Sequence, residues 1–219
     1  MIKRQIAIAS GVSLILMAIV AGFSVGYAYS EFYRPEQLEL LKDNILQNQG
    51  LYQNMLIGIL IIIILDLLVS YTLYKFFEND NKRMSIISGV IRVIYTVIFG
   101  IATYHLTKNL NASDLSNEVI NSNFEQFQLI WYSGLVVFGF HIILIGVLMK
   151  LHQKIPKILW YITLIAGVSY ILVHALKLTS PNSEFVSTLT MILALPMAIG
   201  ELGLALWLIV KGGKAELSN

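Results

Sequence analysis

The sequence predicts an all-α integral membrane protein, a single bundle of six transmembrane helices with both ends of the chain in the cytoplasm. Composition is the first observation behind this prediction. Of the 219 residues, 57% are hydrophobic and only 13% are charged, whereas a soluble domain is about half apolar and about a quarter charged. Because a soluble domain of this size still exposes much of its surface to water, this composition suits lipid as the solvent.

Six long apolar segments are the second observation. The roughly 30 Å hydrocarbon core of a bilayer is crossed by about 20 helical residues. The segments that reach this length are residues 6–29, 54–77, 84–106, 127–149, 158–177 and 185–210. They follow one another without an internal repeat, so we expect a single domain over residues 1–219.

Two of these segments also fit other patterns. The first follows Lys3 and Arg4, as in a secretory signal, but it exceeds the roughly 7–15 apolar residues of a signal peptide. We therefore expect it to be retained as a helix. The second contains the β-branched run 60–65, which would suit a strand in water. In hydrocarbon only a helix satisfies its own backbone hydrogen bonds, so this segment is predicted to be helical too.

The distribution of Lys and Arg is the third observation. Of the 15 such residues, ten lie on one side of the predicted membrane, four lie on the other, and Arg92 lies inside a segment. The ten are Lys3, Arg4, Lys75, Lys82, Arg83, Lys150, Lys154, Lys157, Lys211 and Lys214, and the four are Arg34, Lys42, Lys108 and Lys177. Cytoplasmic connections carry the excess of Lys and Arg, so both chain ends are predicted to be cytoplasmic.

The two long outer connections are predicted to hold short helices. Residues 35–49 begin with Pro35, which suits a first helical position, and place Leu38, Leu41 and Ile45 on one face. Such a face suits a helix that lies on the membrane surface. Residues 113–123 repeat the pattern more weakly. Each helix is interpreted either as a lid or partner surface, or as a tether that covers the bundle.

Small residues and a proline give the packing signals. Ala18, Gly22 and Gly26 recur at intervals of four in the first segment, with Ala7 and Gly11 further back. Small residues at this spacing let helix backbones approach closely in lipid. This stripe either packs within the chain or forms a homodimer. Pro196 in the last segment is expected to kink its helix, because proline removes a backbone donor and clashes with the preceding turn.

Four ionisable residues lie well inside the predicted helices: Asp66, Arg92, His141 and Glu201. A charge there costs about 2.5–3.5 kcal/mol on insertion scales, so each one needs a reason. At 1.5 Å per residue, all four lie about 12–17 Å from the cytoplasmic ends of their helices. Four different helices are therefore predicted to contribute to one intramembrane polar layer.

Two interpretations of this layer remain open. In the structural one, Arg92 pairs with Asp66, with Glu201, or with both, and fixes how the helices pack. In the functional one, two carboxylates against one guanidinium leave a proton or a cation to be taken up, as in an ion-coupled carrier. The layer would then bind a small molecule or an ion.

The remaining candidates for chemistry are histidines. His105 and His174 lie near the outer ends of their segments, and a histidine pair across two helices can hold a haem or a metal. His141 with a carboxylate would suit an intramembrane enzyme. No catalytic fingerprint is present, and the chain has no cysteine. We therefore expect no cofactor, no metal and a non-enzymatic protein. The net charge of +2 gives no sign of a nucleic-acid partner.

Several short motifs resemble one family. They are Leu73-Tyr74, Arg92, Ile155-Pro156, Leu195-Pro196, Glu201 and the run from Ala205 to Gly212. Together they resemble the bacterial membrane proteins grouped as domain of unknown function family 4386, over essentially the whole chain. One departure is that the family has an acidic residue just after the arginine, where this chain has Val93-Ile94-Tyr95.

The resemblance implies a six-helix, multi-pass protein of the bacterial cytoplasmic membrane, and it implies no reaction or ligand. Combined with the polar layer, the sequence favours a small carrier or a membrane sensor or stress-related regulator. A haem- or metal-binding redox protein and an intramembrane enzyme are the alternatives. The lipid bilayer is the one partner that every alternative shares.

Overall fold

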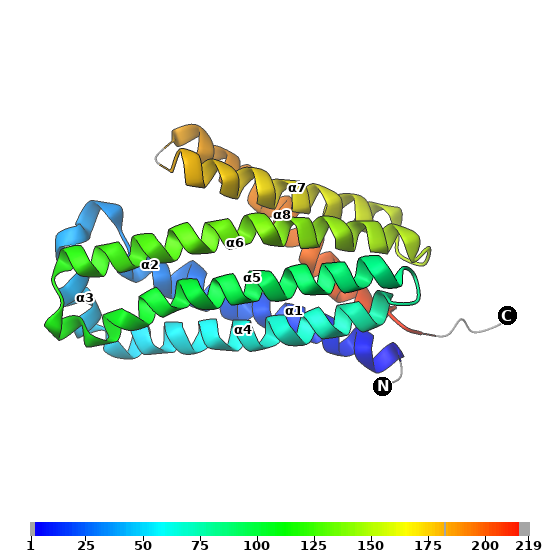
Figure 1. Cartoon of the computed structure of the whole chain (residues 1–219), viewed down its shortest axis with the longest axis horizontal. Coiled ribbons are helices and arrows are strands. Elements are labelled where there is room, and N and C mark those ends of the chain that lie inside the picture. Colours follow the sequence, from blue (N-terminus) through cyan, green and yellow to red (C-terminus); the bar gives the residue numbers. More distant parts are fainter. Residues whose placement is uncertain (1–2, 182, 215–219) are drawn as a thin grey trace.

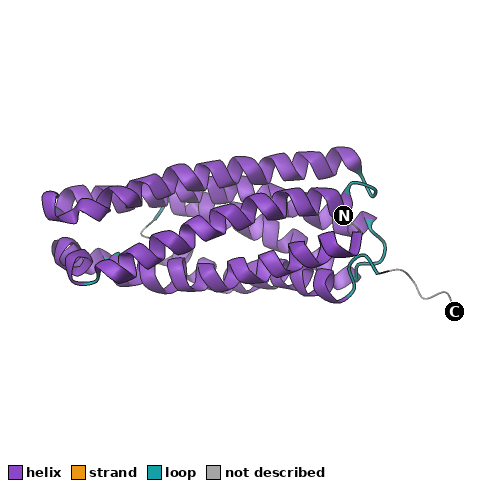
Figure 2. Cartoon of the chain, turned by 90° about the horizontal axis from the view of Figure 1, so that it is seen from below, coloured by secondary structure: helices purple, strands orange, loops and turns teal. Residues whose placement is uncertain are grey.

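The computed structural model describes residues 3–181 and 183–214, and over these residues it is all-α (Figures 1 and 2). Six of the described helical stretches are long and apolar enough to cross a membrane, which confirms the predicted fold class. The α-helices are α1 (Lys3–Ala21), α2 (Tyr29–Phe32), α3 (Leu41–Gln47), α4 (Gln49–Phe77), α5 (Lys82–Lys108), α6 (Asn117–Leu151), α7 (Lys157–Thr179) and α8 (Glu184–Val210). A π-helix, η1 (Gly22–Ala28), and two 3₁₀ helices, η2 (Pro35–Leu40) and η3 (Asn109–Asp114), complete the order.

The long helices pack mainly against their neighbours in the sequence, from α4 to α8, and α1 closes the bundle between α4 and α8. α1 begins and α8 ends at one end of the bundle, together with the α4–α5 and α6–α7 connections (Figure 1). This end, which carries most of the Lys and Arg, is called the inner end below. The opposite end, with the two long connections, is called the outer end.

Glycines allow the closest helix contacts. α6 and α7 cross at Gly139 and Gly167, where a Cβ added to Gly139 would lie 2.8 Å from the Gly167 carbonyl oxygen. α1 and α8 cross near the inner end at Gly11, where an added Cβ would lie 2.6 Å from the Ala205 oxygen. In lipid, such contacts replace the hydrophobic driving force that packs soluble helices.

The predicted stripe of Ala18, Gly22 and Gly26 does not make these contacts. All three residues are exposed, and a Cβ on Gly22 would meet nothing within 4 Å. The outer part of the stripe therefore does not pack closely within the chain, whereas its inner residue Gly11 does, at the crossing of α1 with α8. The homodimer interpretation stays a prediction.

α6 begins well before its predicted start. Residues 113–123 do not form a separate helix, since Ser116 caps α6 and accepts a hydrogen bond from the Val119 amide at 3.5 Å. The helix then runs without interruption through polar sequence into the apolar segment. At 1.5 Å per residue its 35 residues are about 52 Å long, so its first turns project beyond a hydrocarbon core of roughly 30 Å.

The outer end is closed by a cap made of η2, α3 and the first turns of α6. Leu41 and Ile45 on α3 are buried in a cluster that includes Tyr52 and Phe124. The predicted apolar face of residues 35–49 therefore packs on the bundle and not on the membrane surface. The predicted single helix is also broken in two, because Gln37 has non-helical φ and ψ.

The inner end is held by polar contacts between distant parts of the chain. Arg4 on α1 donates to the carbonyl oxygens of Leu208 at 3.1 Å and Gly212 at 2.8 Å, at the end of α8. Carbonyls in a last turn lack helical partners, and an Arg satisfies them. His152, after α6, pairs with Asp80, after α4, at 2.8 Å. The ends of α4, α6 and α8 are thereby joined to their neighbours.

Candidate functional site: an intramembrane polar layer beside a cavity

The centre of the site is a buried ion pair. Arg92 on α5 donates from Nε to Oδ1 of Asp66 on α4 at 2.9 Å and from Nη2 to the same oxygen at 2.6 Å. Each side chain is 1% exposed. Removing two charges from water is expensive unless their geometry and further hydrogen bonds compensate, so the other contacts of the guanidinium matter.

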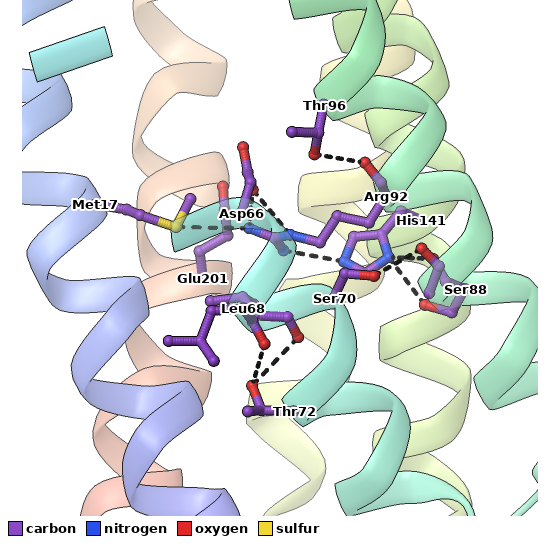
Figure 3. Close-up of polar contacts among 12 residues, drawn as sticks. Met17, Asp66, Leu68, Ser70, Thr72, Ser88, Arg92, Thr96, His141 and Glu201 are labelled. Atoms are coloured by element: carbon purple, nitrogen blue, oxygen red, sulfur yellow. Dashed lines mark hydrogen bonds and ion pairs between the residues drawn. The ribbon is translucent and has the colours of Figure 1, made fainter. Parts of the chain in front are cut away.

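Three more side chains surround the guanidinium group. Arg92 Nη1 lies 3.1 Å from Nε2 of His141 on α6. Nη2 lies 3.9 Å from the sulfur of Met17 on α1, on the opposite side of the guanidinium group from His141 (Figure 3). The guanidinium carbon lies 5.2 Å from the ring centroid of Phe138 on α6, a distance at which a cation and an aromatic face attract each other. One arginine therefore joins α1, α4, α5 and α6.

The contacts of His141 define its protonation. A guanidinium group only donates, so Nε2 of His141 accepts and carries no proton. Nδ1 lies 2.9 Å from the Ser88 carbonyl oxygen and 2.9 Å from the Ser88 hydroxyl, so it carries the proton and donates to the carbonyl. His141 is thus a neutral imidazole that positions Arg92. Among the described hydrogen bonds, none joins His141 to a carboxylate. An intramembrane enzyme built on a histidine–carboxylate pair would require such a bond.

Glu201 on α8 lies in the same region but has a different partner. Its Oε1 accepts a hydrogen bond from the hydroxyl of Tyr170 on α7 at 2.6 Å. The described ion pairs join Arg92 to Asp66 and not to Glu201. Gly200, the preceding residue, brings α8 against α7, since an added Cβ would lie 2.7 Å from the Ala166 Cβ. This close approach places Glu201 next to Tyr170.

A cavity of ≈ 380 Å³ lies beside the layer. Asp66 and Glu201 both line it, and the second carboxylate oxygen of Asp66, Oδ2, is buried with no hydrogen-bond partner among the described residues. In Figure 3 one oxygen of this carboxylate points away from the guanidinium group. Much of the remaining wall is aromatic, with Tyr95, Trp131, Phe138 and Tyr170.

A much smaller void of ≈ 10 Å³ is lined by Arg92, His141, Thr163 and Glu201. Its volume is about that of one water-sized probe, and the rest of its lining is mainly apolar, with Leu14, Ile142 and Leu204 among others. Arg92 lines this void but not the larger cavity, whereas Glu201 lines both. Glu201 is therefore the ionisable group that both spaces share.

The two outer histidines are not brought together. His174 on α7 lines the cavity, where its ring contacts Tyr132 and Tyr170. His105 on α5 contacts the ring of Tyr104 instead, and α6 packs between α5 and α7. Within the described part of the chain, no group of three or more His, Cys, Asp or Glu residues is placed to hold a metal ion.

Sequence reasoning placed the four ionisable residues at a similar depth but missed their uncharged partners. Tyr170, Ser88 and Met17 complete the site, and none of them carries a charge that would mark it in a hydrophobic segment. Pro196 lies inside α8, one turn before Gly200, and α8 continues through it to Val210. The predicted kink stays a prediction.

Comparison with known proteins gives a family match and a curated relative. The family model described as "Domain of unknown function (DUF4386)" matches residues 9–212. A protein of Archaeoglobus fulgidus named "Uncharacterized protein" is 29% identical over 159 residues, which cover 73% of this chain and 84% of the relative. No solved structure matches.

Proposed function

Because the chain belongs to the family described as Domain of unknown function (DUF4386), whose description names no reaction, we propose its function from the cavity itself. We propose a small multi-pass carrier that binds an organic cation inside the bundle. The observation that carries the proposal is that two carboxylates line one largely apolar cavity, while the one guanidinium group beside them is already paired with Asp66.

The charge balance of the layer supports a cationic ligand. With both carboxylates ionised, Asp66 and Glu201 carry two negative charges, Arg92 carries one positive charge, and His141 is neutral by its hydrogen bonds. One negative charge is left, and an uncompensated charge in this environment is costly. A proton on Glu201 balances the empty site, and a bound cation replaces that proton.

The shape of the site supports a ligand larger than a metal ion. The cavity has room for an organic molecule, and aromatic faces attract alkylammonium groups. Tyr170 and Phe138 form an edge-to-face pair with centroids 5.2 Å apart on the wall near the carboxylates. The small void, which Glu201 also lines, supports a carrier. It is a second space next to the carboxylate that would exchange a proton for the cation.

Changing Glu201 to Gln is expected to weaken the binding of benzyltrimethylammonium by roughly 10–100-fold, the worth of one hydrogen bond or ion pair to a charged group. Isothermal titration calorimetry of the protein in lipid nanodiscs measures this. The uncharged isostere neopentylbenzene should bind the variant and the natural protein with the same affinity. Glu184→Gln is the matched control, since Glu184 is an exposed residue of the same helix.

Two results would contradict the proposal. One is equal affinity of the natural protein for benzyltrimethylammonium and neopentylbenzene. That result would mean that the carboxylates do not distinguish a cation from an uncharged molecule of the same shape. The other is an equal loss of affinity in Glu201→Gln and Glu184→Gln. A carrier also requires that proteoliposomes accumulate the cation when a proton gradient is imposed, whereas a sensor would bind the cation without moving it.

We also propose that the inner end faces the cytoplasm and that the protein resides in the cell membrane. The excess of Lys and Arg at that end supports it. The chain has no cysteine, so single cysteines report the orientation cleanly. Asp114→Cys, at the outer end, is expected to react with a membrane-impermeant maleimide in intact cells. Lys157→Cys, at the inner end, is expected to react only after the cells are opened, and the reverse pattern would invert the topology.

A further inference from the structure

The two helices that border the cavity on the open side diverge from one another. Near the inner end α1 and α8 touch at Gly11 and Ala205, and Arg4 ties their ends together. Further out, at Gly22, the first residue of η1, an added Cβ would meet no atom of a neighbouring helix in the described structure within 4 Å. In Figure 1, α8 runs towards the outer end beside α7, while α1 stays beside α4. The space between α1 and α8 therefore widens outwards.

The cavity reaches into this widening space. Its lining includes Ala18 and Ala21 on α1 and Ala198 and Leu202 on α8. Ala18, Ala198 and Leu202 are exposed, although they line the cavity, so the cavity is open where they lie. They lie near the middle of two membrane-spanning stretches, Lys3–Phe32 and Glu184–Val210, which is the depth of the acyl chains. These four residues, three of them alanines, form the rim of an opening that we call the side portal.

The alternative route, from the outer water, is obstructed by side chains. A separate outer groove of ≈ 490 Å³ is lined by Tyr132 and Lys177, among others, and it has a partly polar wall. Tyr132 lies between this groove and His174 of the cavity, with ring centroids 5.8 Å apart. Lys177 in turn lies 5.0 Å above the Tyr132 ring. This stack separates the outer groove from the cavity.

From this geometry we infer that the ligand enters sideways from the bilayer through the side portal. The inference rests on the proposed function for the ligand's charge and adds its chemical class: a membrane-dissolved amphiphile with a cationic head and an apolar body. The head reaches Asp66 and Glu201, the aromatic walls enclose the adjoining part, and the apolar remainder extends between α1 and α8 into lipid. A strongly hydrated cation without an apolar body would have no path through acyl chains.

Brominated lipid and one tryptophan test the portal without any ligand. The chain has three Trp residues, and Trp160→Phe with Trp207→Phe leaves Trp131, which lines the cavity. In bilayers of phosphatidylcholine brominated at mid-chain, Trp131 fluorescence is expected to be quenched. Adding Ala18→Phe and Ala198→Phe, which fill the side portal, should abolish most of that quenching. Ile19→Phe with Ile192→Phe is the matched control, because both residues face lipid at similar depth, and it should leave the quenching unchanged.

The outcomes separate cleanly. Equal quenching in the filled and control variants would overturn the portal, as would stronger quenching of Trp131 by aqueous iodide than by brominated lipid. If the double Phe variant does not fold, as judged by circular dichroism and size-exclusion chromatography, Ala18→Val with Ala198→Leu replaces it. Since the quenching is measured without any cation, its result does not depend on whether benzyltrimethylammonium binds. Calorimetry on the natural protein and Glu201→Gln likewise does not depend on the portal variants, so the portal and the proposed function can fail separately.

Discussion

Replacing Arg92 by Met is expected to lower the free energy of unfolding by about 3–5 kcal/mol, the cost of leaving a buried charge without its partner. The loss arises because Asp66 keeps its carboxylate at 1% exposure, and His141 loses the donor to Nε2. Equilibrium unfolding by titration with sodium dodecyl sulfate in mixed micelles measures the change. Arg83→Met, an exposed residue of the same helix, should change the stability little.

A second variant distinguishes a packing role from a binding role. Asp66→Leu added to Arg92→Met removes both charges, and replacing a buried ion pair by apolar residues is often neutral for stability. We expect this double variant to regain much of the lost stability and to bind benzyltrimethylammonium more weakly than the natural protein, because Asp66 no longer lines the cavity while Glu201 keeps the one uncompensated negative charge. If the double variant is as unstable as Arg92→Met alone, the ion pair is not the source of the effect.

Gly167→Ala is expected to destabilise the protein by roughly 1–3 kcal/mol, the usual cost of overpacking a close contact. The added Cβ would lie 2.8 Å from the Ile143 amide nitrogen and 2.9 Å from the Gly139 carbonyl oxygen. Both are backbone atoms, so the neighbouring helix has to move away. The same titration in mixed micelles measures the loss, and Gly139→Ala should behave alike because it sits at the same crossing.

Gly100→Ala gives the matched control with the opposite sign. A Cβ at Gly100 on α5 would meet nothing within 4 Å, so the substitution only raises helix propensity. It is expected to stabilise the protein by about 0.5–1 kcal/mol. A loss of stability at Gly100 similar to that at Gly167 would mean that the glycine crossing of α6 and α7 has no special role.

The number and type of the membrane-spanning helices follow from hydropathy, whereas the start of α6 does not. The last segment was predicted as 185–210 and α8 is Glu184–Val210, because Ser183 and Glu184 mark its start. The fourth was predicted as 127–149, while α6 starts at Asn117. Hydropathy reports only the lipid-buried part of a helix. The cap at Ser116 followed by Glu118 was the available signal for the true start.

For the candidate site, the sequence predicts how deep each ionisable residue lies in the membrane, but it does not predict which side chains contact one another. Counting residues from the helix ends placed Arg92 near Asp66, and the two are in contact. The same count placed Glu201 equally near, yet it bonds to Tyr170. Which side chains meet depends on how each helix is rotated about its axis. That rotation is decided by small residues such as Gly200 against Ala166, whose effect appears only when both helices are seen together.

The length of α6 also has a mechanical consequence. The helix runs without a break from Asn117 to Leu151, so its backbone hydrogen bonds make it a stiff rod from outer water to inner water. About two thirds of the way along it carries His141, and just past its end His152 holds Asp80. One continuous helix therefore connects the outer cap to the histidine beside Arg92 and to the connection after α4. A shift of its outer end along the helix axis would change the surroundings of both histidines together.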